Sequence, residues 1–140
     1  MTDYVQFPDL ATVARSAALQ GLPDFGVTGI DIGTETPSPM PEQFIKLVPL
    51  PGGEICRRTM WGQVIGEVYD LVDDMRCSQL AHQLAMVWRA APDRLIDGQQ
   101  PVTEPCEING PFPSKDPDMP DAYRYQVTVT WTVQSTVLTV

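Results

Sequence analysis

The C-terminal segment alternates strictly between apolar and polar residues, which predicts a β-strand with one buried face. Successive side chains of a strand point to opposite faces. The face expected in the core carries Tyr123, Tyr125, Val127, Val129, Trp131 and Val133. The other face is polar but almost uncharged, and carries Arg124, Gln126, Thr128, Thr130, Thr132 and Gln134. Strands that face bulk water normally include Lys and Glu, so this row is predicted to face something other than bulk water.

Two segments have apolar residues at helical spacing. Residues 7–22 predict a helix with a small, alanine-rich stripe, which consists of Leu10, Val13, Ala14, Ala17 and Ala18. Residues 72–93 predict a second helix, whose stripe consists of Cys77, Leu80, Ala81, Leu84, Val87, Trp88 and Ala91. Asp73 and Asp74 favour the start of this helix through its dipole, and Pro92 ends it. The small side chains of the first helix predict close packing against a sheet.

The outer face of the second helix carries two methionines, which is unusual for a solvated surface. Its residues are Met75, Gln79, His82, Met86 and Arg89. One interpretation is chance, because single exposed hydrophobic residues are common. The other interpretation is a contact with another subunit, and on that basis Met75, His82, Met86 and Arg89 are interface candidates.

Between these elements the pattern predicts further strands and proline-rich connections. Val27, Ile30 and Ile32 indicate a short strand, and residues 36–41 an extended connection. Residues 43–50 and 58–71 predict a β-hairpin with its turn at residues 51–54. Residues 102–108 predict an edge strand, since Pro105 interrupts them, and residues 110–122 a loop. The expected fold is a single α+β domain, 1–140, with a mainly antiparallel sheet and both helices packed on one face.

Composition and charge narrow the function classes. The 140 residues are 43% hydrophobic and 19% charged, which is typical of a folded domain that needs no disulfide or metal to supply a core. Nine basic against eighteen acidic residues give a net charge of −9. This argues against a surface that grips nucleic acid, which requires Lys and Arg. It is compatible with a conduit past which DNA slides, because an acidic wall repels phosphate.

The sequence offers little that resembles a catalytic or metal centre. Cys56, Cys77 and Cys106 are far apart and form no CxxC pair, so no metal site and no cofactor is expected. His82 follows Cys77 by five positions, and residues at that spacing on a helix do not face each other. We therefore expect no catalysis. Arg57 and Arg58 form the one local basic spot, too small for nucleic acid but able to meet an acidic partner.

The N-terminus and the hydropathy pattern bear on location. "MTDYVQFPDL" has neither a basic region nor an apolar run, so no signal peptide is expected. No run approaches the roughly 20 apolar residues that a membrane span requires, so no membrane partner is expected. These features predict a protein made in the cytoplasm and kept there or in something assembled there.

Five segments together resemble one known family. They are "FPDLATVARSAAL", "TETPSPMPEQFIKLVPLPGGE", "WGQVIGEVYD", "DDMRCSQLAHQLAMVWRA" and "AYRYQVTVTWTV". Each is similar to a segment of the tail terminator proteins of long-tailed phages, especially phages that infect actinobacteria. The likeness covers nearly the whole chain and is one of pattern and order, without a catalytic signature.

The resemblance implies a structural virion protein in the neck region of the tail, assembled in the host cytoplasm. Such proteins form a hexameric ring at the head-proximal end of the tail tube, stop tube polymerisation and join the tail to the head. The implied partners are further copies of the chain, the tail tube protein and a head–tail connector, with DNA passing through the lumen without sequence-specific binding. Adjacent sheets in a ring can pack side by side or line an inner wall, so their outer faces need not meet bulk water. This would account for the polar but uncharged outer row with Thr128, Thr130 and Thr132.

Two other functions stay open from the sequence. Another head–tail joining protein, a neck, connector or stopper, would share the size, acidity and ring formation. A stand-alone ligand-binding or enzymatic α+β domain is the alternative from a different class. Interface candidates besides the helix face are Arg57 and Arg58 at the hairpin and the proline-rich "PFPSKDPDMPD" segment.

Overall fold

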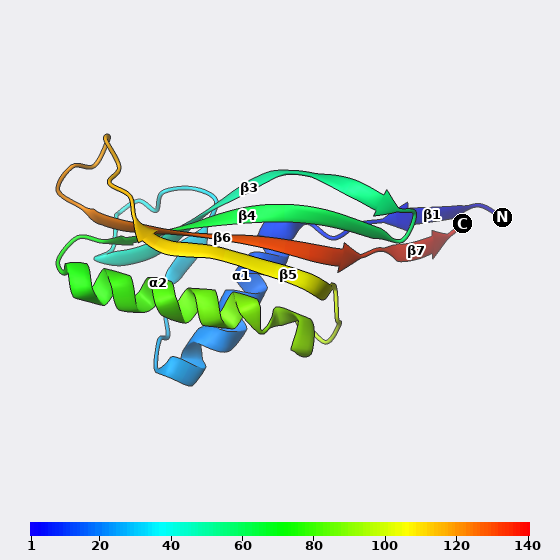
Figure 1. Cartoon of the computed structure of the whole chain (residues 1–140), viewed down its shortest axis with the longest axis horizontal. Coiled ribbons are helices and arrows are strands. Elements are labelled where there is room, and N and C mark those ends of the chain that lie inside the picture. The colour runs from blue at the N-terminus through cyan, green and yellow to red at the C-terminus, as the bar shows by residue number, and fades with distance from the viewer.

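The computed structural model describes all residues, 1–140, and has two α-helices and a mostly antiparallel sheet (Figure 1). The helices are α1 (Leu10–Gly21) and α2 (Asp74–Arg89), each followed by a short 3₁₀ turn, Leu22–Phe25 and Ala91–Asp93. The strands are β1 (Asp3–Gln6), β2 (Asp31–Gly33), β3 (Gln43–Cys56), β4 (Thr59–Asp70), β5 (Val102–Pro113), β6 (Tyr123–Gln134) and β7 (Thr136–Thr139). This is an α+β fold, as the sequence predicts.

Five strands form one sheet in the order β2-β3-β4-β6-β5, and both helices lie on one side of it (Figure 1). All neighbours are antiparallel except β2 and β3, which run parallel. Every residue of the two predicted helical stripes is buried. A Cβ on Gly62 would collide with Leu10 of α1, and one on Gly66 with Trp88 of α2. These two glycines therefore let both helices approach β4 closely.

β6, which contains the alternating segment, lies between β4 and β5. Val127, Val129, Trp131 and Val133 are buried beneath the helices, and Tyr123 and Tyr125 pack half-buried against the same core. The predicted core face is thus confirmed. The Thr row points to the opposite side of the sheet, which no helix covers (Figure 1). We call this side the open face.

The predicted position of the turn between β3 and β4 is wrong. Residues 51–54 belong to β3, and the strands remain paired through Gly53 with Trp61, Glu54 with Met60 and Cys56 with Thr59. The chain reverses at Arg57 and Arg58 instead. Pro49 and Pro51 do not end the strand because β2 pairs only with Phe44–Lys46, so β3 has no partner on its outer side there.

β5 is an edge strand, as predicted, but extends to Pro113, so residues 110–113 are strand rather than loop. The pairing with β6 shifts between Thr103 and Cys106 and again between Asn109 and Phe112, which accommodates Pro105 and Pro111. Gly110 has a φ of 93°, a conformation that favours glycine. Both long edges of the sheet thus carry prolines, and prolines blunt hydrogen-bonded pairing with a further strand.

β1 and β7 form a separate two-stranded antiparallel ribbon, which the sequence pattern does not predict. Asp3 pairs with Thr139 and Gln6 with Thr136. Each strand has four residues, too few for a clear periodic signal. The ribbon places both chain ends beyond the β3–β4 turn, at one end of an elongated molecule (Figure 1).

Candidate assembly surfaces

The outer face of α2 is exposed along its whole length. Met75, His82, Met86 and Arg89 all lie on this side, with 80% of Met75 and 51% of Met86 exposed. The His82 Nδ1 is 2.8 Å from the Ser78 carbonyl oxygen one turn earlier, so the imidazole lies along the helix surface. This face points to solvent because the apolar stripe on the other side of α2 packs into the core.

Met86 and Arg89 border a shallow hollow of about 600 Å³ between α2 and the edge strand β5. Ala85, Ala90 and Ile108 supply its apolar wall. Arg89 spans the hollow and donates a hydrogen bond to Glu104 of β5 at 3.1 Å, which raises the pKa of Arg89. This groove combines apolar surface with one ion pair at its rim, and Met75 and His82 lie outside it.

Replacing Met75 and Met86 together by glutamate tests the α2 face. Both side chains are exposed, so the circular dichroism of the free chain should not change. If this face packs against another subunit, the added charge should weaken assembly by about tenfold or more, because a carboxylate buried without a partner is costly. The measurement is the sedimentation profile of the two proteins at equal concentration. Unchanged assembly would remove the α2 face from the interface.

The open face of the sheet holds Thr128, Thr130 and Thr132. The Thr132 hydroxyl donates to the Pro105 carbonyl at 3.0 Å, and the residue is buried. Thr130 accepts a hydrogen bond from Gln63 of β4 at 3.0 Å, whereas Thr128 lies between Ile65 and Asn109. Beyond β4, the same face continues into half-buried Val48 and Leu50 of β3. It is therefore a mixed apolar and hydroxyl surface. Its charged residues are Glu107, opposite Thr130, and, toward the other end, Lys46 and the Glu67–Arg124 pair.

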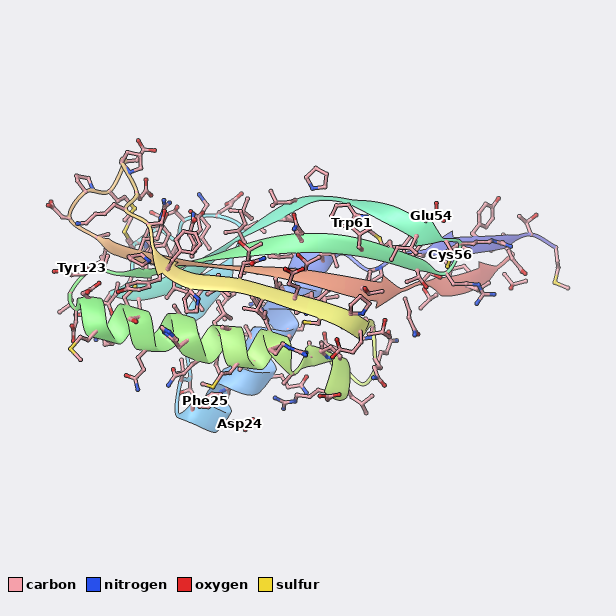
Figure 2. The ribbon with its side chains drawn as sticks, in the orientation of Figure 1. Asp24, Phe25, Glu54, Cys56, Trp61 and Tyr123 are labelled. Carbon is pink, nitrogen blue, oxygen red and sulfur yellow. The ribbon has the colours of Figure 1, made fainter.

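Arg57 and Arg58 lie at the turn of the β3–β4 hairpin, beside the β1–β7 ribbon. We call Ile55–Arg58 the hairpin tip; Figure 2 shows Cys56 there, far from the helices. The Arg57 guanidinium makes one long contact, 3.5 Å, to the Asp3 carbonyl, and the Arg58 carbonyl accepts from the Ser135 amide at 2.9 Å. Neither arginine side chain pairs with a carboxylate, in contrast to Arg76, Arg89, Arg94 and Arg124.

Another exposed surface lies at the other end of β4; the sequence points to its Met75 but not to the rest of it. This surface, which we call the acidic turn, consists of Leu71–Asp73 between β4 and α2 and the first two residues of α2, Asp74 and Met75, and all five residues are exposed. Val72 is 60% exposed and Leu71 37%. Asp73 caps α2 by accepting the Met75 amide at 3.0 Å, and Asp74 occupies the first turn. From the sequence, Asp73 and Asp74 are attributed only to the start of the helix. The exposure of the hydrophobic residues beside them is therefore not predicted.

Just below the acidic turn, a buried carboxylate fixes the β4–α2 junction. Asp70 is fully buried, and Arg76 donates to both of its oxygens, at 2.6 and 2.9 Å. The Val72 and Asp73 amides also donate to it. Burial by itself would raise the pKa of Asp70, but these hydrogen bonds outweigh it and lower the pKa. The acidic turn is therefore held rigidly against the sheet.

Arg124 performs a similar task for the proline-rich segment 114–122. It pairs with Glu67 of β4 at 2.6 Å and donates to the Ser114 carbonyl. Tyr69 donates to Asp116 at 2.8 Å, and burial raises the pKa of Tyr69 to about 12. The segment is thus anchored at its base, with Met119 packed near Phe44 and Tyr69. Arg124, the single charged residue in the outer row of β6, therefore has a structural role.

A polar hollow of about 400 Å³ lies where the β1–β7 ribbon joins the main sheet. Gln6, Gln99, Gln100, Gln134 and Thr136 line it, together with Ser135. The Ser135 hydroxyl is buried and has no hydrogen-bond partner. No sequence signal indicated this hollow, since it depends on the pairing of the two chain ends.

The groups that could perform chemistry lie apart from one another. The Cys77 thiol is buried and donates to the Val68 carbonyl at 3.2 Å, and burial raises its pKa to about 12. His82 is on the opposite, exposed face of α2. No group of three or more His, Cys, Asp or Glu side chains is arranged to hold a metal ion. None of the helices combines the length and apolarity of a membrane span.

The predicted interface residues therefore occupy three separate surfaces: the α2 face, the open face of the sheet and the hairpin tip. Met86 and Arg89 share one groove, and the three surfaces lie in different parts of the molecule. Comparison of the sequence with models of known protein families and with curated proteins finds no match.

Proposed function

We propose that this chain is a tail terminator of a long-tailed phage, a subunit of a ring at the head-proximal end of the tail tube. The observation that carries the proposal is the open face of the sheet. Both helices cover the other side, and this side presents a charge-poor Thr row beside Val48, Leu50 and Ile65. Such a surface suits a wall or a neighbouring subunit better than bulk water.

Three further features support the proposal. The five segments that resemble tail terminators form, in chain order, α1, β3, β4, α2 and β6. The net charge of −9 suits a ring through which DNA passes without sticking. The anchored proline-rich segment 114–122 and the hairpin tip project from the sheet as candidate contacts with the tail tube protein or the connector. The ring stops tube growth by covering the last tube ring, and its other side receives the filled head.

The proposal predicts that Thr130 is either covered by a neighbouring subunit in the assembled ring or faces the lumen. In a Cys56→Ser background, a Thr130→Cys variant that a subunit covers should react with a bulky maleimide about tenfold more slowly in the ring than in the free chain. Glu35→Cys, on an exposed loop, is the control and should react equally in both states. Equal rates at position 130 would show that no subunit covers the open face, which the proposal then requires to line the lumen.

Particle mass separates this proposal from a stand-alone domain. Purified chain at high concentration, alone or with its tail tube protein, should give particles of six times the chain mass. A chain that stays monomeric under both conditions and binds a small molecule would contradict the proposal. The polar hollow with its unpaired Ser135 hydroxyl is where such a ligand would bind.

A further inference from the structure

The hairpin tip and the acidic turn are complementary surfaces at opposite ends of one molecule. The tip presents two arginines without carboxylate partners beside Ile55, which is 58% exposed. The acidic turn presents Asp73 and Asp74 among exposed Leu71, Val72 and Met75. Each surface thus combines hydrophobic side chains with charge, and the two charges have opposite sign.

The two surfaces cannot meet within one chain. They follow the two ends of β4, Thr59 and Asp70, which at about 3.3 Å per residue lie roughly 35 Å apart. Figure 2 shows Cys56 near one end of the molecule and Tyr123, the cross-strand partner of Asp70, at the other. Both surfaces rest on rigid elements, because β3 and β4 are paired to the turn and the Asp70–Arg76 pair holds the acidic turn.

We propose that the hairpin tip of one copy of this chain docks on the acidic turn of the next copy. Arg57 and Arg58 then face Asp73 and Asp74, and Ile55 covers Val72 and Met75. The contact joins two different patches, so it is heterologous, and repeated contacts of this kind close into a ring when the rotation between copies allows it. The inference rests on the proposed ring and assigns its subunit interface.

Alternative ways of joining copies fit the structure less well. Edge-to-edge extension of the main sheet is blunted by Pro49 and Pro51 on β3 and by three prolines on β5. A symmetric contact of two tips would bring four arginines together, and two acidic turns would bring four aspartates together. Of these three arrangements of the two surfaces, the head-to-tail one pairs opposite charges.

The native Cys56 permits a direct cross-linking test. It is exposed, whereas Cys77 is buried and Cys106 half-buried. Wild-type chain is mixed with a Cys56→Ser/Asp74→Cys variant and treated with a short bismaleimide. The expected product is a covalent dimer of one wild-type and one variant chain. The matched acceptor Cys56→Ser/Glu35→Cys has its thiol in place of another exposed carboxylate and should give at least tenfold less dimer.

Charge reversal supplies the second measurement. Arg57→Glu/Arg58→Glu should weaken self-association about a hundredfold, because like charges then face each other across the contact. Adding Asp74→Lys in the same chain, which keeps the Asp73 cap of α2, should restore part of it. No preference for position 74 over position 35, or no rescue by Asp74→Lys, overturns this interface. If rings of the predicted mass still form in that case, the proposed function stands and only the interface is wrong.

Discussion

Replacing Trp88 by alanine should lower the free energy of unfolding by about 3–5 kcal/mol, the range observed when a large aromatic side chain is removed from a core. Trp88 is fully buried between α1 and the sheet. Its indole nitrogen donates to the Ala14 carbonyl at 3.1 Å, and its ring meets Trp131 edge-on with centroids 6.0 Å apart. Because Gly66 provides the space under this ring, alanine would leave a cavity and would remove the hydrogen bond from the indole to Ala14.

The measurement is urea unfolding followed by circular dichroism, compared with Gln79→Ala on the exposed face of the same helix. The control should change stability by less than about 0.5 kcal/mol, as surface substitutions usually do. A Trp88→Ala variant within about 1 kcal/mol of the wild type would mean that α2 does not pack on the sheet as described.

Replacing Asp70 by asparagine should lower the free energy of unfolding by about 2–3 kcal/mol at neutral pH. Removing one partner of a buried ion pair costs about 3–5 kcal/mol, and the value is lower here because 39% of the Arg76 side chain is exposed. Asparagine also cannot accept at both atoms the hydrogen bonds that Asp70 accepts from Arg76, Gln43, Val72 and Asp73.

The Asp70 prediction has a defined pH dependence. The pKa of Asp70 is lowered in the folded chain, so its contribution is fully present above the unfolded pKa of about 3.9 and is lost as the pH falls through the folded pKa. The stability difference between wild type and Asp70→Asn should therefore shrink as the pH falls below about 4 and through the folded pKa. Glu42→Gln removes the exposed second partner of Arg76 and should have little effect. A difference independent of pH would contradict the pairing.

Much of the fold could be predicted from the sequence because it depends on periodicity. The stripes of both helices and the alternation of β6 fix which side chains enter the core, and one-sided strands with only two helices give the α+β class. The turn at Arg57 and Arg58 could not be predicted, since Gly52 and Gly53 suit a turn and their place in β3 follows from the register with β4. The β1–β7 ribbon depends on contact between the two chain ends, which local patterns do not encode.

For the candidate surfaces too, some features follow from local periodicity and others depend on tertiary contacts. The outward direction of Met75, His82, Met86 and Arg89 follows from helical spacing. The groove that Met86 and Arg89 share with Ile108 requires β5 to lie beside α2, which is tertiary information. Similarly, the lack of carboxylate partners for Arg57 and Arg58 and the exposure of Val72 emerge only when every other charge and side chain has been placed.

The proposed function, termination of a phage tail, is tested most directly by tail length. If the proposal is right, the gene lies in a phage genome; it is deleted there, and tails in the lysate are measured by electron microscopy, with the gene supplied in trans as the control. We predict overlong tails without heads, restored to uniform length by the supplied gene. Tails of normal length beside heads that leak DNA would contradict the claim and identify a head-side connector instead.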